Sequence, residues 1–214
     1  MIDISVKAKY KTVKKHAQTM FIEKKSKFIT NVSPCKTEEE ALDFLKQIRT
    51  QYPDATHNVY AYIIDENNIF RYSDDGEPGG TAGMPVLDTI RKEEIVDVCV
   101  VVTRYFGGTL LGTGGLVHAY GASARQGLLE AEIITRCLCN VICIKVDYHL
   151  SGKIQYKIAS EKLILENTDY GNDVCFYVCC LIEETEKFLK EITELTNGKA
   201  ICTVAEQKYV DLNV

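Results

Sequence analysis

The chain has 214 residues, enough for one large domain or two small ones, and 46% of them are hydrophobic, which allows a sizeable core. Its formal net charge of −5 argues against a generally basic nucleic-acid-binding protein. No apolar run approaches the ~20 residues of a membrane span, the N-terminal stretch lacks the apolar core of a signal peptide, and the nine cysteines are odd in number, so we expect a cytoplasmic protein with reduced thiols and no membrane partner.

Positive charge gathers at the start of the chain. The first 27 residues contain eight lysines against Asp3 and Glu23. Such a segment predicts either a contact with a phosphate backbone or a solvated, partly frayed terminus. Residues 19–23 and 27–32 are strand-like runs on either side of a Lys-Lys-Ser turn, so this segment also predicts a hairpin.

A helix followed by a second hairpin is predicted next. Thr37 is a suitable N-cap with Glu40 at capping-box spacing, and Pro53 ends the helix. The apolar residues of this segment share one helical face: Ala41, Leu42, Phe44, Leu45 and Ile48. Residues 56–65 and 68–73 then predict two strands that turn at Glu66–Asn68.

The middle of the chain alternates loops rich in glycine with regular elements. Residues 73–83 predict a loop, residues 84–93 a short helix and residues 94–106 a buried strand. A second glycine-rich loop then leads into a helix over residues 114–132. Eleven of the 14 glycines lie between Gly76 and Gly127, which concentrates the unusual backbone in this region.

From Thr135 onward the pattern changes to strand, helix, hairpin, helix and strand. The βαββαβ order is that of the split βαβ, or ferredoxin-like, motif. Gly198 is a suitable stop for the second helix. We therefore expect two domains, residues 1–134 and residues 135–214.

Six cysteines in this second half have spacings that invite comparison with a zinc site: Cys137, Cys139, Cys143, Cys175, Cys179 and Cys180. Structural zinc sites use short Cys-x₂₋₄-Cys knuckles on turns. Here the residues fall in predicted strands, where neighbours such as Cys179 and Cys180 point to opposite faces. Buried structural thiols are the favoured interpretation, with no metal and no cofactor.

Three carboxylates crowd into the acidic loop, at Asp74, Asp75 and Glu77. They predict either a cation or acid–base site, in which mutual repulsion raises at least one pKa, or an acidic turn. The spacing does not fit a calcium-binding loop. His57, at the start of a predicted strand, is either a general base near Asp74 or Glu77 or a structural histidine.

The second glycine loop follows Arg104 and carries Gly107, Gly108 and Gly112–Gly115. It lacks the lysine of a phosphate-binding P-loop. It nevertheless leads from a strand into a helix, whose first N–H groups favour anions, with Thr113 as the expected N-cap. The alternative is that small residues here let the helix pack tightly on the sheet. The sequence supports both interpretations.

Two long motifs resemble those of one protein family. YSDDGEPGGTAGMP (residues 72–85), VVVTRYFGGTLLGTGGLVHAYG (residues 100–121) and His57 in THNVYAY strongly resemble the YigZ/IMPACT family, and the resemblance covers the whole chain. It implies an α+β protein with a two-layer β/α N-terminal domain of the ribosomal-protein/elongation-factor-G domain IV type and a ferredoxin-like C-terminal domain. It also implies a link to translation, in which eukaryotic relatives have a regulatory role.

We therefore expect a cytoplasmic binding or regulatory protein that contacts RNA, the ribosome or a translation-factor protein, or a phosphate-bearing ligand. The expected binding residues are those of the motifs: His57, Asp74, Asp75, Glu77, Arg104, Gly107, Gly108, Gly112, Thr113, Gly114 and Gly115. In particular, Gly112–Gly115 and Arg104 are expected to form an anion-accepting pocket. The alternative is an enzyme that acts on a phosphorylated or nucleotide substrate, with a metal ion held by Asp74, Asp75 or Glu77.

Overall fold

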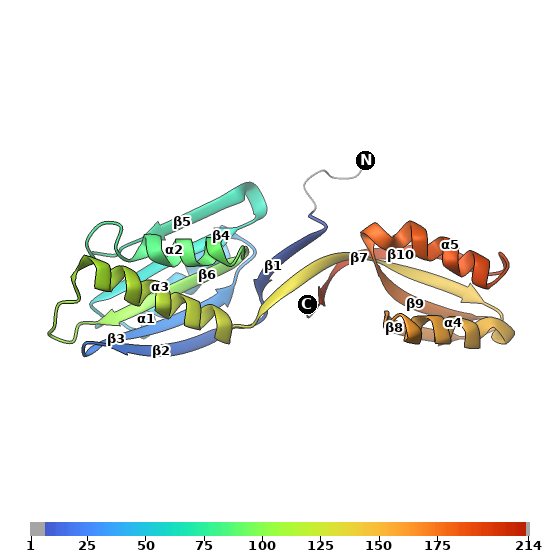
Figure 1. Ribbon diagram of the computed structural model, residues 1–214, viewed down its shortest axis with the longest axis horizontal. Helices are drawn as coiled ribbons and strands as arrows, with labels where there is room; N and C mark the ends of the chain where they lie inside the picture. Colours follow the sequence, from blue (N-terminus) through green and yellow to red (C-terminus); the bar gives the residue numbers. More distant parts are fainter. Residues whose placement is uncertain (1–6, 213–214) are drawn as a thin grey trace. The chain divides into compact units, whose positions relative to one another are not determined.

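The computed structural model describes residues 7–212. Within this range it is a mixed α+β structure with two five-stranded sheets and five α-helices, which confirms the expected class (Figure 1). It divides into two compact units, residues 10–135 and residues 7–9 with 136–212. No helix among the described residues is both long and apolar enough to cross a membrane.

The sheet of the first unit is antiparallel throughout and holds both predicted hairpins. Its strand order is β2 (Ala17–Glu23), β3 (Ser26–Pro34), β6 (Val98–Tyr105), β4 (His57–Ile64) and β5 (Ile69–Ser73). Between β2 and β3 the chain turns at Lys24 and Lys25, whose φ angles are 44° and 69°. Positive φ at both central residues is the requirement of a type I′ hairpin turn.

Helices cover both faces of this sheet. One core joins Val98, Val100 and Val102 of β6 to α2 (Gly83–Lys92) and α3 (Gly112–Glu130). The other joins Cys99 and Val101 to α1 (Glu38–Gln51). The expected two layers are therefore the sheet with α2 and α3, and α1 adds a third layer on the opposite face.

The start of α1 follows the predicted capping pattern with one difference. The N–H of Glu40 donates to Thr37 Oγ1 at 3.2 Å, which confirms Thr37 as the N-cap. In return the Glu40 carboxylate accepts the N–H of Lys36 at 2.6 Å, one residue before the N-cap. Both orphan donors are still satisfied, so the pair fixes the helix start as a capping box does.

The second unit has the predicted βαββαβ order. Its elements are β7 (Ile133–Val146), α4 (Tyr148–Ser160), β8 (Ile164–Tyr170), β9 (Val174–Leu181), α5 (Thr185–Leu195) and β10 (Ile201–Leu212). In the sheet, β7 pairs with both β9 and β10, and β8 is outermost beside β9. The short strand β1 (Lys9–Val13) also pairs with β7 and completes the five strands. Apolar residues of α4 and α5 pack with β7 and β9 into one core.

The cysteines of this unit lie on strands, as predicted. Cys179 and Cys180 join different apolar clusters, on opposite faces of the sheet. Burial raises the pKa of the Cys179 thiol to about 12 and that of Cys180 to about 11. Both therefore remain protonated at neutral pH and act as small apolar side chains.

We expect the fragment of residues 135–214 to unfold cooperatively on its own. Its core is formed by residues between Ile142 and Cys202, so the fragment keeps all of it. It loses the pairing of β1 with β7 and two further peripheral bonds, from the Leu138 N–H to the Ala8 carbonyl and from the Tyr209 hydroxyl to the Lys7 carbonyl. A thermal melt followed by circular dichroism should show a single sigmoidal transition. A broad, non-cooperative melt would contradict independent folding.

Candidate functional site

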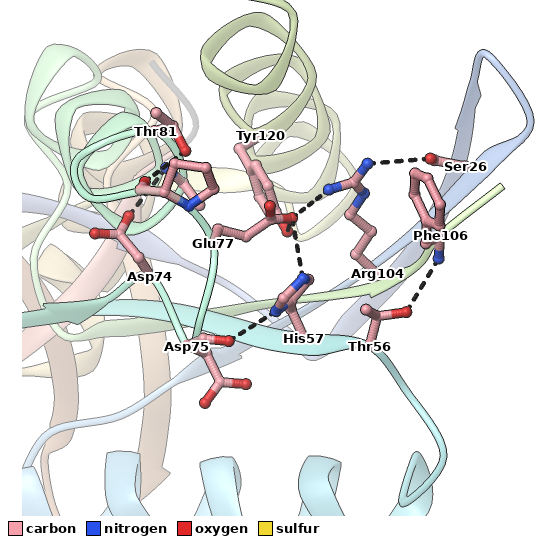
Figure 2. Close-up of polar contacts among 12 residues, drawn as sticks. Ser26, Thr56, His57, Asp74, Asp75, Glu77, Thr81, Arg104, Phe106 and Tyr120 are labelled. Atoms are coloured by element: carbon pink, nitrogen blue, oxygen red, sulfur yellow. Dashed lines mark hydrogen bonds and ion pairs between the residues drawn. The ribbon is translucent and has the colours of Figure 1, made fainter. Parts of the chain in front are cut away.

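A buried ion pair lies at the centre of the site. Arg104 is near the end of β6, opposite Phe28 of β3 and His57 of β4. Its Nη1 lies 2.5 Å from Glu77 Oε1, and both side chains are at most 5% exposed (Figure 2). The Tyr120 hydroxyl of α3 donates to the same Glu77 oxygen at 2.7 Å. Burial, and then this hydrogen bond, raise the pKa of Tyr120, so its hydroxyl remains a donor.

The His57 ring is held beside this pair. Its Nδ1 lies 2.8 Å from the backbone carbonyl of Asp75, which can only accept, so Nδ1 carries the hydrogen (Figure 2). That orientation brings Nε2 within 3.8 Å of Glu77 Oε1. His57, Glu77 and Arg104, predicted as binding residues from separate segments, therefore meet in the fold.

The three carboxylates of the acidic loop have separate partners, which favours the acidic-turn interpretation over a shared site. Asp74 accepts the N–H groups of Gly80, Ala82 and Gly83 at 2.8–3.0 Å, at the start of α2. Asp75 accepts the N–H of Asn58 at 2.6 Å and forms an ion pair with Arg49 at 3.3 Å.

No shared cation site results from this arrangement. Within residues 7–212, no group of three or more His, Cys, Asp and Glu side chains could hold a metal ion. The metal-binding set that the enzymatic alternative required is therefore not formed by the Asp74, Asp75 and Glu77 side chains.

The glycines of the second loop are required for different structural reasons, and one of them is not required for packing. A Cβ on Gly107 would lie 2.0 Å from the backbone carbon of Lys25, so close approach requires glycine there. Gly108 and Gly112 have φ angles of 79° and 76°, which favour glycine. A Cβ on Gly115 would lie 3.1 Å from Leu111 Cβ, whereas one on Gly114 would have nothing within 4 Å. Packing therefore does not explain Gly114.

The start of α3 differs from the prediction. Thr113 is inside the helix rather than its N-cap, because the helix begins at Gly112 with Leu111 as the N-cap. Leu111 has no side-chain oxygen, and no side chain caps this terminus. The first turn contains no acidic residue either, so its helix dipole is left without a complementary charge.

A pocket of about 410 Å³ lies between the buried ion pair and this helix start. Five predicted site residues line it: His57, Glu77, Arg104, Gly112 and Thr113. The remaining wall is mostly apolar and consists of Thr56, Pro78, Phe106, Leu110, Leu111 and Leu116. The other predicted residues do not line it: Asp74, Asp75, Gly107, Gly108, Gly114 and Gly115. The pocket thus joins the two motifs.

Three residues of the site were not predicted from the sequence. A buried tyrosine hydroxyl needs a hydrogen-bond partner, and that was the available signal for Tyr120. Ser26 Oγ accepts both Arg104 Nη2 and the Gly107 N–H, each at 3.2 Å. Phe106 is 46% exposed on the pocket wall. No pattern in the sequence indicates the roles of Ser26 and Phe106, since these roles depend on strand pairing.

The lysines of the N-terminal segment fall into two groups. Lys14 and Lys15 both form ion pairs with Glu132, at 3.1 and 2.5 Å, and Lys11 forms one with Glu94 at 2.9 Å. The exposed lysines of the β2–β3 turn, here called the basic turn, are Lys24 and Lys25, and the backbone of Lys25 lies against Gly107. Positive charge is therefore present next to the pocket wall, whereas the earlier lysines are partly neutralised.

Comparisons with known proteins identify both halves of the chain. Residues 24–128 match the model of the Impact N-terminal domain, and residues 144–199 match a domain of unknown function, DUF1949. The IMPACT family member YvyE of Bacillus subtilis is 40% identical over 94% of each chain. The IMPACT family member YigZ of Escherichia coli is 32% identical over 82% of this chain and 87% of its own.

A solved structure supports the fold over the same extent. It is described as the crystal structure of a hypothetical protein, and it aligns with a TM-score of 0.59 and 28% identity over 94% of this chain and 99% of that one. The motifs that meet at the pocket lie within the matched N-terminal domain. The chain belongs to the IMPACT family.

Proposed function

We propose that this chain is a regulatory protein linked to translation that binds single-stranded RNA through the basic turn and the neighbouring pocket wall. The observation that carries the proposal is the position of the exposed Lys24–Lys25 turn, whose backbone meets Gly107 directly after the exposed Phe106. Proteins that bind single strands combine positive side chains, which attract the phosphates, with aromatic rings on which bases stack. The resemblance of the family to regulators of translation suggests that this RNA takes part in translation.

The conformation of the basic turn adds support. Lys24 and Lys25 both have positive φ, where a type I′ turn prefers Asn followed by Gly. Lysine is disfavoured in this conformation, because its Cβ crowds the backbone. A charged pair at positions that favour other residues is consistent with a role for the charge itself.

Replacing Lys24 by Asn together with Lys25 by Gly tests the proposal without weakening the turn. We expect the affinity for a fluorescently labelled oligouridylate, measured by polarisation, to fall about 10-fold at low salt, and the salt slope to decrease by about 1.4, since two phosphate contacts are lost. Phe106→Ala should weaken binding by about 1–3 kcal/mol through lost stacking. Both variants should melt at or near the temperature of the unchanged protein.

The matched control removes two exposed lysines elsewhere, Lys46 on α1 and Lys153 on α4, by substitution with glutamine. It has the same change in net charge, so a comparable loss of affinity would show that total charge, rather than the basic turn, attracts RNA. Unchanged affinity and slope in the Lys24→Asn, Lys25→Gly variant would contradict the proposal.

A further inference from the structure

We propose that the pocket binds one nucleotide unit, with the phosphate at the start of α3 and the base against the apolar wall. The inference deepens the proposed function and rests on it for the chemical class of the ligand. The same chemistry is present in a free nucleoside monophosphate and in the phosphorylated end of an RNA strand. The first turn of α3 lines the pocket with Gly112 and Thr113, and no side chain caps it.

The start of α3 is suited to an anion for two reasons. Its first N–H groups have no intrahelical acceptor, and the helix dipole adds partial positive charge there. No acidic side chain occupies the first turn. Gly112 and Thr113, which line the pocket, are both exposed, so a phosphate can reach the backbone at this helix start.

The Arg104 side chain gives a second, independent indication that the pocket binds a ligand. The residue is 4% exposed and lines the pocket, and its Nε has no hydrogen-bond partner. The other two guanidinium nitrogens bond Glu77 and Ser26. A buried N–H without an acceptor destabilises the protein, so an acceptor brought by a ligand at this wall would be favoured.

The Glu77 carboxylate does not prevent an anion from binding. Arg104 neutralises its charge at 2.5 Å, and the Tyr120 hydroxyl donates to the same oxygen. His57 Nε2 lies 3.8 Å from that oxygen. The acidic residues that could repel a phosphate from further away, Asp74 and Asp75, are held by the α2 N–H groups and by Asn58 with Arg49.

The remainder of the pocket fits a planar, largely apolar body. Phe106 is 46% exposed and Leu110 is 83% exposed, and Pro78, Leu111 and Leu116 complete the wall. The volume of about 410 Å³ is within the range of small-molecule sites. An inorganic phosphate would leave this wall unused, whereas a base can stack on Phe106.

The test compares three probes by isothermal titration calorimetry: adenosine 5′-monophosphate, adenosine and inorganic phosphate. We expect the monophosphate to bind at least about 10-fold more tightly than either other probe, since both ends of the pocket contribute. Thr113→Glu places a carboxylate in the first turn of α3 at the pocket wall, which suits the helix dipole but repels a phosphate, so affinity for the monophosphate should fall about 10-fold. The matched variant Thr113→Gln has nearly the same size as Thr113→Glu without the charge, and its affinity should stay within about threefold of that of the unchanged protein.

Equal binding of the monophosphate by the two Thr113 variants would overturn the inference, as would equal binding of the three probes. A failure of the proposed function can be distinguished from a failure of this inference. The proposed function is tested by the affinity for oligouridylate and by the Lys24→Asn, Lys25→Gly variant, and neither result changes the calorimetric comparison of the three probes. Comparing the affinity for RNA with a 5′-phosphate and for the same RNA with a 5′-hydroxyl shows whether the pocket takes a phosphorylated RNA end or a free nucleotide. Tighter binding of the phosphorylated strand assigns the pocket to RNA ends, and equal binding assigns it to a free nucleotide.

Discussion

We expect Arg104→Met to lower the free energy of unfolding of the N-terminal unit by about 3–5 kcal/mol, because it leaves the Glu77 carboxylate buried without its cation. Glu77 is 4% exposed at the side chain, so water cannot replace the lost partner. Methionine keeps much of the volume and the contact with the rings of Phe28 and Phe106. Urea denaturation followed by circular dichroism at neutral pH measures the change.

A double-mutant cycle shows whether the charge is the cause. Adding Glu77→Gln removes the uncompensated charge, so the double variant should be more stable than Arg104→Met alone. The control is Arg125→Met, which breaks the exposed pair of Arg125 with Glu93 at 3.7 Å and should cost less than about 1 kcal/mol. Simple addition of the two single effects at Arg104 and Glu77 would contradict the assignment of the loss to a buried charge.

Gly107→Ala should lower the free energy of unfolding by about 3 kcal/mol, the upper part of the range for overpacking. The added Cβ would lie 2.0 Å from the Lys25 carbonyl carbon and 2.4 Å from the Ser26 nitrogen. These are backbone atoms of the β2–β3 turn, so no side chain can rotate to make room. A shift of the turn would also weaken the Gly107 N–H bond to Ser26. Urea denaturation again gives the change in stability.

Gly114→Ala is the matched control within the same motif. Its Cβ meets nothing within 4 Å and the residue is inside α3, so alanine should be neutral or stabilising by up to about 1 kcal/mol. Two glycines seven residues apart are thus expected to have opposite outcomes. Equal destabilisation by both substitutions would show that the close contact at Gly107 is not what limits the loop.

The elements were largely predictable because their signals are local. The N-cap at Thr37 and the apolar periodicity of the helices depend on residues a few positions apart. The boundary of α3 was less predictable. Thr113 has the preferred chemistry for an N-cap, which would start the helix at Gly114, but the helix begins two residues earlier at Gly112, which adopts positive φ without strain.

The site could be predicted only as a set of residues, not as an arrangement. His57, Glu77 and Arg104 were identified from motif chemistry, yet their meeting depends on the pairing of β4 with β6. The neighbouring carboxylates Asp74 and Asp75 looked equivalent to Glu77 in sequence. They differ because backbone N–H groups supplied by the fold bind two of the three, and an arginine binds the third.

The buried ion pair also helps to determine the register in which β6 pairs with β3 and β4. β6 is buried on both faces, with Val98, Val100 and Val102 toward α2 and α3 and with Cys99 and Val101 toward α1. Shifting such a strand by one residue exchanges its faces but still places apolar side chains in both cores, so hydrophobicity alone distinguishes mispaired alignments poorly. Only the native alignment sets Arg104 between Phe28 and His57 on the face where Glu77 and Tyr120 lie. A shifted strand would separate the Arg104 guanidinium from the Glu77 carboxylate. The cost of that separation disfavours mispaired alignments of β6.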